Sequence, residues 1–404
     1  MRDRPRLVVV SPFVDKRHGT ERRVAEWLSR LAETFEIHLY SQRVADIDLT
    51  EITWHRIPKL PGPHLLNYIW WFAANHLWRG WDERFHGLHP DLVFSPGINC
   101  LDADVMSVHV VFEQYRQQNA EHLSPRVQSL RDWPAILHRK LYYALIARLE
   151  RRLYRNPRRS LILISGRTRV PLKSFYGRCE KFPVVYQGVD QKTFNPATRL
   201  SLREFARKSL RLSSGQFVLL LIGNDWKNKG LPVLLKAFRY LDAFPLQLLV
   251  VGQDNPSYYR ELVQRNQGQV RVQFLPPRKD VEFYYAAADA YAGPSREDTF
   301  AQPPAEAMAC GLPVITSATN GTSEIIDNGV DGFVMPDASD ASELASLIRR
   351  IYEDPAMRES IGAKAAEKMR QFTWERNGRE MTEILTKVLE EKHSLAAAAL
   401  RQEA

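Results

Sequence analysis

Short apolar segments alternate with amphipathic helical segments along this chain, and the alternation runs through it twice. The apolar segments are continuous rather than alternating, and most are rich in Val, Leu and Ile. Runs of this kind, each followed by a helical pattern, are typical of parallel strands buried on both faces. We therefore expect an α/β protein with doubly wound sheets. The predicted strands lie at 7–10, 37–40, 92–94, 161–164, 218–222, 246–251, 272–275, 290–292 and 314–316.

The two runs predict two domains. The first is a Rossmann-like domain over 1–190. The second is a Rossmann-like domain over 191–371, which begins with a polar segment, 191–214. We expect the amphipathic segment 372–391 to be a helix that packs back on the first domain, and the alanine-rich end after it to fray. Two such domains facing each other create a cleft at the carboxyl ends of their strands.

Composition indicates the cellular compartment of the chain. The three cysteines in 404 residues are an odd number, widely spaced and without a CxxC pair. This argues against a disulfide framework or a zinc site and favours a reducing compartment. No apolar run approaches the roughly 18 residues of a membrane-spanning helix, and the first apolar run is too short for a signal peptide. These features predict a cytoplasmic protein.

Nearly all of the net charge of +9 lies in one segment, 126–159, where ten Lys or Arg face only Asp132 and Glu150. Its core, 134–154, has the leucine spacing of a helix with interleaved tyrosines. Basic, tyrosine- and leucine-rich helices suit an anionic membrane surface, and the aromatic segment 65–72 is a second candidate. A solvated helix face and a core segment remain alternatives. No nucleic-acid-binding motif accompanies the charge.

A glycine-rich turn with lysines opens the second domain. Gly223 follows the strand at 218–222, and Lys227, Lys229 and Gly230 precede a helical segment, 231–241. The order differs from a P-loop and from the dinucleotide glycine fingerprint. A lysine-bearing loop that leads from a strand into a helix nevertheless suits a phosphate. A solvated turn is the alternative.

Two acids mark a second loop in this domain. Asp298 follows the strand at 290–292, and Glu306 lies eight positions later, in the first turns of the next helix. We expect the carboxylates to hold sugar or ribose hydroxyls and the backbone N–H groups of 300–302 to point into the cleft. Glu306 also has a simpler explanation, since a glutamate near a helix N-terminus complements the helix dipole.

These motifs together resemble the GT-B glycosyltransferases of family 4. The resemblance rests on the two loops, on Gly188-Val-Asp190, and on Glu306-Ala-Met-Ala-Cys-Gly-Leu-Pro-Val, and it covers residues 5–390. Within the family, the basic helix and the Gly223–Gly230 loop look most like the lipopolysaccharide-core glucosyltransferases. Another pair, Asp102-Ala-Asp104, superficially resembles a metal-binding motif of a different transferase fold, which the two-domain α/β pattern argues against.

The resemblance implies a retaining transfer of a sugar from a nucleotide-sugar, expected to be a UDP-hexose, without a metal or other cofactor. The implied acceptor is a membrane-associated glycan or glycolipid such as lipopolysaccharide core. The implied catalytic residues are Asp298, His109 and Lys229. Donor contacts are implied for Gly19, Asn224, Lys227, Lys229, Arg278, Asp298, Phe300, Ala301, Gln302 and Glu306.

Some of these residues match the residue type that is common in the family, and others differ from it. Lys229 matches the diphosphate-binding lysine, and Glu306 matches the acid that binds the donor ribose. Asn224 stands where many members have an arginine, a loss for which Lys227 would compensate, and Asp298 stands where glutamate is commoner. A soluble glucan synthase, a sugar-nucleotide epimerase and a non-catalytic sugar-nucleotide-binding homologue remain open.

Overall fold

A computed structural model describes residues 4–16, 19–118, 133–213, 215–241, 244–265 and 270–403. The chain forms two compact units, Met1–Tyr186 with Glu375–Ala404, and Gln187–Trp374. The chain thus passes from the first unit to the second and returns at its end. The sequence pattern places these two passages at 190/191 and 371/372, a few residues from where the structure has them.

The first unit is built on a six-stranded parallel sheet of order β5-β3-β1-β6-β7-β8. If these strands are counted along the chain, the order is 3-2-1-4-5-6, the doubly wound arrangement that the sequence predicts. A short parallel pair, β2 and β4, stands beside it. The strands are β1 (Arg6–Val10), β2 (Phe13–Val14), β3 (Glu36–Ser41), β4 (Arg43–Val44), β5 (Ile52–Arg56), β6 (Leu92–Pro96), β7 (Val105–Val108) and β8 (Ser160–Leu163).

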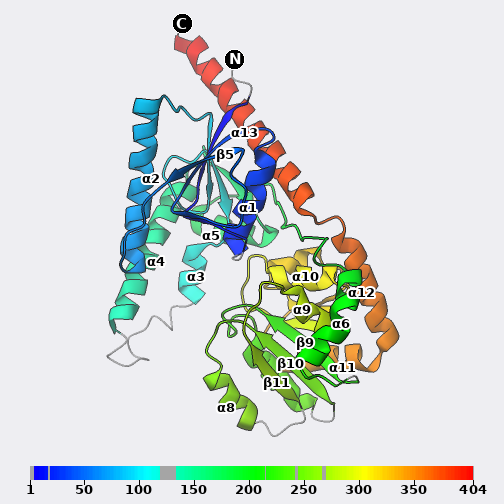
Figure 1. Ribbon diagram of the computed structural model, residues 1–404. Helices are drawn as coiled ribbons and strands as arrows, with labels where there is room; N and C mark the ends of the chain where they lie inside the picture. The colour runs from blue at the N-terminus through cyan, green and yellow to red at the C-terminus, as the bar shows by residue number, and fades with distance from the viewer. Residues whose placement is uncertain are drawn as a thin grey trace. The chain divides into compact units, whose positions relative to one another are not determined.

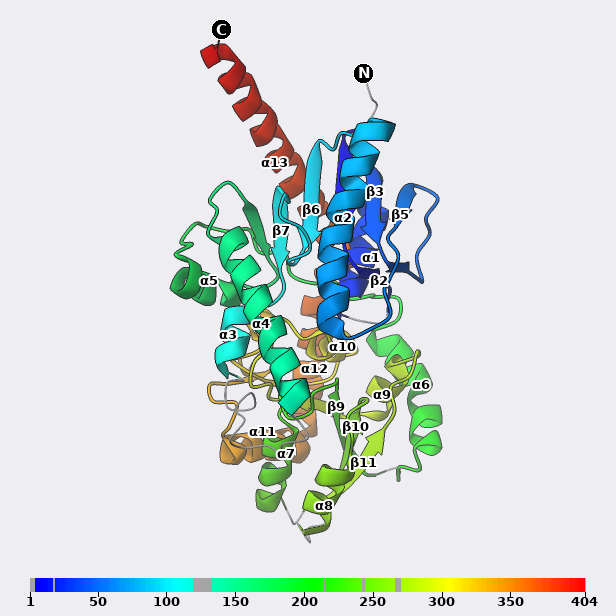
Figure 2. The same cartoon turned by 90° about the vertical axis from the view of Figure 1, so that its left-hand side faces the viewer.

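Helices cover both faces of this sheet (Figure 1). On one face α1 and α13 pack over a core that includes Trp27, Leu28 and Phe94. On the other face α2, α4 and α5 pack over Trp71, Ile146 and Leu172, and Figure 2 shows α2 and α4 in front of the strands. The helices are α1 (Gly19–Leu31), α2 (His64–His86), α3 (Phe112–Gln118), α4 (Trp133–Tyr154), α5 (Arg169–Tyr176) and α13 (Trp374–Glu403), with a 3₁₀ turn at Gly166–Thr168.

The C-terminal helix α13 packs on the first unit, as the sequence predicts. Met381 and Leu385 are fully buried in the core under α1. The indole Nε1 of Trp27 donates to Asn377 Oδ1 at 2.6 Å, and Asn377 Nδ2 donates to the carbonyl of Tyr186 at 2.7 Å. The helix continues to Glu403, so the alanine-rich end that we expected to fray is helical in the structure.

The second unit repeats the same strand order in its own six-stranded parallel sheet, β11-β10-β9-β12-β13-β14. The polar segment before it is not a linker, because most of it forms helix α6. The strands are β9 (Phe217–Ile222), β10 (Leu246–Val251), β11 (Arg271–Leu275), β12 (Ala290–Gly293), β13 (Val314–Ser317) and β14 (Phe333–Met335). The helices are α6 (Pro196–Ser209), α7 (Leu231–Ala237), α8 (Ser257–Arg265), α9 (Glu282–Ala287), α10 (Gln302–Ala309), α11 (Ala341–Glu353) and α12 (Pro355–Met369), with 3₁₀ turns at Phe238–Tyr240 and Gly321–Ile325.

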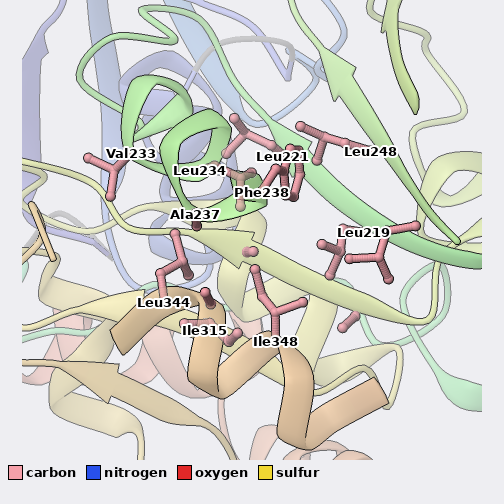
Figure 3. Close-up of a cluster of buried hydrophobic side chains, with 14 of the residues drawn as sticks. Leu219, Leu221, Val233, Leu234, Ala237, Phe238, Leu248, Ile315, Leu344 and Ile348 are labelled. Atoms are coloured by element: carbon pink, nitrogen blue, oxygen red, sulfur yellow. The ribbon is translucent and has the colours of Figure 1, made fainter. Parts of the chain in front are cut away.

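The core of the second unit fixes the strand ends from which the functional loops leave. Leu219, Leu221 and Leu248 on the sheet meet Leu234 of α7 and Ile348 of α11, all buried (Figure 3). Burying such side chains stabilises the unit by about 1.5–3 kcal/mol each. The loops that follow β9 and β12 therefore start from a rigid base.

No helix in the described ranges is both long enough and apolar enough to cross a membrane.

The packing of α13 gives a direct test. Leu385→Ala removes a fully buried side chain and leaves a cavity, so we expect it to lower the free energy of unfolding by about 2–5 kcal/mol. Leu395→Ala changes the same residue type in the same helix, where the side chain is 73% exposed, and we expect a change within about 0.5 kcal/mol. Urea denaturation followed by tryptophan fluorescence measures both. Equal losses would contradict the packing of α13 described here.

Candidate functional site

The predicted donor-binding loops leave two neighbouring strands at the point where the strand order reverses. Strand β12 pairs with β9 in the middle of the second sheet, and both strands run in the same direction. Their carboxyl ends therefore lie at one edge, and this switch point is where open α/β sheets bind ligands. The β9 loop carries Lys229 and the β12 loop carries Asp298.

Backbone contacts join the two loops to each other. Gly230 has a φ of +92°, and a side chain there would overlap the backbone of Pro294. The amide N–H of Arg296 donates to the carbonyl of Asn228, and the Asn228 side chain donates to the carbonyl of Glu297, both at 2.7 Å. The loops thus form one unit, and Gly230 is required because no other residue tolerates both its φ and this close approach.

Lys229 and Asp298 meet across this junction. The ammonium Nζ of Lys229 forms an ion pair with Asp298 Oδ2, and both side chains are largely buried, with 17% of each exposed. The Lys229 side chain lies over Gly223, whose φ of +138° and missing side chain leave room for it. The sequence predicts both residues as donor ligands, and the structure brings them into direct contact.

Asn320 holds the loop that follows Asp298. The amide N–H of Asp298 donates to the carbonyl of Thr319 at 3.1 Å. The Oδ1 of Asn320 accepts from the N–H groups of Ala301 at 3.2 Å and Thr322 at 3.1 Å. This differs from our expectation that the N–H groups of 300–302 are open, because the Ala301 N–H already has a partner inside the unit.

Phe300 and Gln302 also contact the start of this unit. The Phe300 side chain is buried, and its carbonyl accepts from Gln187 Nε2 at 3.4 Å. The Gln302 side chain donates to the carbonyl of Gly188 at 2.7 Å. Both residues therefore position the loop in addition to any contact with a ligand.

Glu306 lies in α10 at the same edge of the sheet and is 5% exposed. Its Oε2 accepts from the Tyr285 hydroxyl at 2.9 Å. Burial and the neighbouring Glu306 raise the pKa of Tyr285 well above its ordinary value, so the hydroxyl is a donor that orients the carboxylate. A buried carboxylate at this edge of the sheet suits the recognition of hydroxyl groups.

Asn224, Lys227 and Arg278 are the other predicted donor ligands in this unit. Asn224 accepts from the backbone N–H of Gln253 at 3.0 Å, and so connects the ends of β9 and β10. Lys227 lines a separate pocket with Arg296. Arg278 forms a bidentate ion pair with Asp280, at 2.9 and 2.6 Å, and stacks over Phe283.

Two predicted residues belong to the first unit. Gly19 is the first residue of α1, and the space around it is open. His109 follows β7, and its Nδ1 lies 2.9 Å from Arg23 while its Nε2 lies 2.6 Å from the Ser107 hydroxyl. A guanidinium only donates, so Nδ1 accepts and the ring proton is on Nε2. Burial, with the adjacent Arg23 cation, holds the pKa of His109 well below its ordinary value, and the imidazole is neutral at pH 7.

The described part of the chain holds no group of three or more His, Cys, Asp or Glu arranged to bind a metal ion. The Asp102-Ala-Asp104 pair has other partners. Asp102 forms a bidentate ion pair with Arg79, and Asp104 accepts from the N–H of Val93 and from Lys392. Both carboxylates therefore act in the packing of the first unit.

Three residues that position the site escaped the sequence analysis: Asn228, Tyr285 and Asn320. Each acts through a hydrogen bond to a residue at least 19 positions away, which no spacing pattern shows. The sequence Asn320-Gly321-Thr322 is typical of a turn, and this pattern could have indicated Asn320.

Comparison with known families agrees with this site. Residues 203–368 match the family described as Glycosyl transferases group 1. The match contains both switch-point loops, Lys229, Asp298 and Glu306.

Curated relatives carry glycosyltransferase names. D-inositol 3-phosphate glycosyltransferase 1 of Catenulispora acidiphila is 32% identical over 219 residues, which are 50% of this chain and 51% of that protein. D-inositol 3-phosphate glycosyltransferase of Actinosynnema mirum is 35% identical over 210 residues, 48% of this chain and 49% of that protein. The chain thus spans about half the length of the curated relatives it matches.

Solved structures share the fold over nearly the whole chain. WaaG, a glycosyltransferase involved in lipopolysaccharide biosynthesis, has a TM-score of 0.74 at 19% identity and covers 94% of this chain and 99% of its own. Sucrose-phosphate synthase from Thermosynechococcus elongatus has a TM-score of 0.74 at 21% identity, covering 96% and 100%. Anabaena HepE, solved with UDP-glucose, has a TM-score of 0.68 at 20% identity, covering 95% and 99%. These likenesses confirm the GT-B fold predicted from the sequence.

The environment of His109 predicts how stability depends on pH. The folded protein keeps this imidazole neutral, whereas the unfolded chain takes up the proton near pH 6.5. The contribution of His109 is therefore complete above pH 6.5 and decreases as the pH falls below it, because the unfolded state then binds more protons.

We expect His109→Gln to reduce the loss of stability between pH 7.5 and 5.5, measured by urea denaturation at the two pH values. His393→Gln is the control, because it makes the same substitution at an exposed histidine of α13. The same pH dependence in wild type and His109→Gln would contradict this assignment.

Proposed function

We propose that this protein is a retaining glycosyltransferase that moves a sugar from a nucleotide-sugar to a glycan or glycolipid acceptor. The observation that carries the proposal is the meeting of Lys229 and Asp298 at the switch point of the second sheet, with Glu306 at the same edge. A cation next to acceptors of hydroxyl hydrogen bonds fits a ligand that contains both phosphate and sugar groups.

The relatives support this donor class. Three features agree: the group 1 family match over 203–368, the glycosyltransferase names of the curated relatives, and the UDP-glucose bound to HepE, which shares the fold. We propose a UDP-hexose as the donor. Its diphosphate binds Lys229, its sugar hydroxyls bind Asp298, and its ribose hydroxyls bind Glu306.

The proposed reaction needs no metal and no protein nucleophile. When the bond between the anomeric carbon and the diphosphate oxygen breaks, negative charge grows on the departing diphosphate, and Lys229 stabilises it. The acceptor hydroxyl attacks the anomeric carbon from the side of the leaving group and gives its proton to a diphosphate oxygen. The new bond therefore keeps the anomeric configuration.

The ion pair implies an exchange of partners on donor binding. Asp298 neutralises Lys229 in the free protein. A diphosphate carries more negative charge than one carboxylate, so the ammonium moves to the phosphate and Asp298 turns to the sugar hydroxyls. Before the donor binds, the ion pair holds both side chains at the site without leaving a buried charge unpaired.

The acceptor is proposed to bind the first unit and to reside at an anionic membrane surface. Seven basic residues of the α4 region are exposed and make no ion pair with any described residue: Arg139, Lys140, Arg148, Arg151, Arg152, Arg155 and Arg158. Trp133, Leu137 and Leu141 of the same helix are also exposed, at 50–58%. Exposed apolar and basic groups on one helix suit the interface of an anionic bilayer. Part of the predicted basic segment, 126–132, lies outside the described residues.

The aromatic segment 65–72 lies in α2 and has both buried and exposed side chains. Trp71 is buried in the core, whereas Leu66 and Ile69 are 61% and 46% exposed. The two helices touch near this segment, where His64 and Tyr68 contact Tyr142 of α4. The exposed side chains of α2 extend the proposed membrane surface.

The donor site gives the first test of the proposal. Lys229→Ala removes the cation that stabilises the leaving group, and we expect the rate of sugar transfer to fall about 10²–10³-fold. Lys364→Ala is the matched control, because Lys364 is an exposed lysine of α12 outside the loops. The assay follows release of UDP in the presence of UDP-hexoses and a glycan acceptor. A Lys229→Ala protein with wild-type turnover would show that the lysine has another role.

The membrane surface has a separate test. Changing Arg148, Arg151, Arg152 and Arg155 to Glu reverses four exposed charges, each worth about 1 kcal/mol near an anionic surface. We expect binding to liposomes of anionic lipids, measured by sedimentation, to be lost, while UDP binding stays unchanged. Liposome binding equal to that of the wild type would exclude α4 from the interface.

A further inference from the structure

A pocket in the second unit is lined by four arginines, Arg199, Arg203, Arg358 and Arg370. Its walls come from α6, the residue before β12, the turn between α10 and β13, and α12. Its volume is about 490 Å³, which lies within the range of small-molecule sites, roughly 300–1,000 Å³. None of the residues proposed to bind the donor lines this pocket.

The pocket lies at the opposite ends of the strands from the donor loops. Two of its lining residues, Asp289 and Pro313, directly precede β12 and β13. These strands are parallel to each other and to β9, so their amino-terminal ends share one edge of the sheet. Lys229 and Asp298 stand on loops that follow the carboxyl ends. A ligand in this pocket is therefore separate from the proposed donor site.

Backbone contacts fix the walls of the pocket relative to one another. A side chain at Gly362 of α12 would overlap the carbonyl oxygen of Gly311, so α12 packs directly on the turn before β13. Asp289 joins the start of β12 to β9, because its N–H donates to the carbonyl of Val218 and its Oδ2 accepts from the Val218 N–H, both at 2.8 Å. The lining arginines thus stand on elements that are held in place by the fold.

The carboxylates of the pocket do not balance its cations. Asp289 pairs with Arg203 at 2.5 Å and also with Arg207, which lies outside the lining, at 3.4 Å. Glu367 pairs with Arg370 at 2.7 Å, and both side chains are exposed. Glu359 is the third carboxylate of the lining and is exposed to solvent. Two of the three carboxylates are therefore already engaged by other arginines.

Arg199 has no carboxylate partner within the described ranges, although it is half-buried. Its Nη1 reaches only the carbonyls of Cys310 and Gly311, at the long distances of 3.5 and 3.3 Å. Its Nε is buried and has no hydrogen-bond partner among the described residues. A buried donor of a charged group is costly to leave unpaired, so this guanidinium has unused capacity to bind an anion.

Arg358 is a second cation of this kind. It donates to the carbonyl of Ile351 at 3.1 Å and lies over the ring of Phe217, but it forms no ion pair with a described residue. Burial holds the pKa of Arg199 below its ordinary value, and the neighbouring Arg203 and Arg358 cations act in the same direction. Both guanidinium groups nevertheless stay charged at neutral pH. The pocket thus holds adjacent cations that repel one another.

We propose that this pocket binds a phosphoryl group, either as inorganic phosphate or as the phosphate of a small organic monoester. The phosphate oxygens accept charge-assisted hydrogen bonds from Arg199 and Arg358 and neutralise both. A phosphate monoester carries a charge of about −1.5 to −2 at pH 7, which matches two unpaired guanidinium groups better than a single carboxylate does. The fork of N–H donors on each guanidinium fits phosphate oxygens. The inference goes beyond the proposed function and does not depend on it.

The experiment is calorimetric titration of the full chain, at constant ionic strength in a buffer free of phosphate, with inorganic phosphate and with glycerol 3-phosphate. We expect the double variant Arg199→Gln/Arg358→Gln to weaken binding at least tenfold. The matched control is Arg271→Gln, which changes an exposed arginine at the start of β11 in the same unit, and we expect its affinity to stay within about twofold of the wild type. We expect the same of Lys229→Ala.

Three results would overturn the inference: neither probe binds the wild type, the double variant binds as tightly as the wild type, or Lys229→Ala loses the binding. The last result would place the phosphate in the donor site. Tighter binding of glycerol 3-phosphate than of inorganic phosphate supports the site with an organic monoester as its ligand, and equal or weaker binding supports it with free phosphate. The proposed function is tested separately, by sugar transfer.

Thermal unfolding shows whether each variant is folded. Phosphate should raise the Tm of the wild type by mass action and leave the Tm of the double variant unchanged. If the double variant does not fold, the single variant Arg358→Gln keeps Arg199 in place, and we expect it to bind phosphate at least threefold more weakly. Wild-type affinity in a folded Arg358→Gln protein would contradict the assignment.

Discussion

The close approach of two loop backbones is the constraint on which the proposed donor site depends. Gly230 lies against Pro294, and Asn228 binds the backbone on both sides of the Arg296–Glu297 peptide. Since β9 and β12 are neighbours with parallel carboxyl ends, this junction places Lys229 beside Asp298 before any ligand is bound. A site that is organised in advance loses little conformational entropy on binding.

Both units pair buried polar groups. In the second unit Lys229 and Asp298 stand on loops at the switch point, and their largely buried side chains form an ion pair. In the first unit His109 contacts Arg23 and Ser107, and Asp102 pairs with Arg79. The family match, 203–368, lies in the second unit. This agrees with the proposal that the second unit binds the donor.

Much of the fold follows from the sequence, because strands buried on both faces of a parallel sheet appear as short, continuous apolar runs. All nine predicted strands are present, and so is the return of α13 to the first unit. The strands β5, β7 and β14 were not predicted, since Thr53, His55 or Ser107 interrupt their apolar pattern or the run is only three residues long. Helix α6 looked like a linker because its many charges hide the few residues that it buries.

The candidate site was predictable only in part. Lys229, Asp298 and Glu306 follow predicted strands or begin a predicted helix, so the topology alone brings them to one edge. The partners that hold them do not show in any spacing, since Asn320 acts on Ala301 and Tyr285 on Glu306 through the tertiary fold. Lys227, which the sequence predicts as a donor ligand, lines a pocket together with Arg296.

Lys229, Asp298 and Glu306 are proposed to bind a nucleotide-sugar together. A crystal structure of the protein with a UDP-hexose is the direct test. We expect Lys229 Nζ within hydrogen-bond distance of the diphosphate, Glu306 at the ribose hydroxyls, and Asp298 released from the lysine and bound to the sugar. A nucleotide bound elsewhere, with the Lys229–Asp298 ion pair intact, would contradict it.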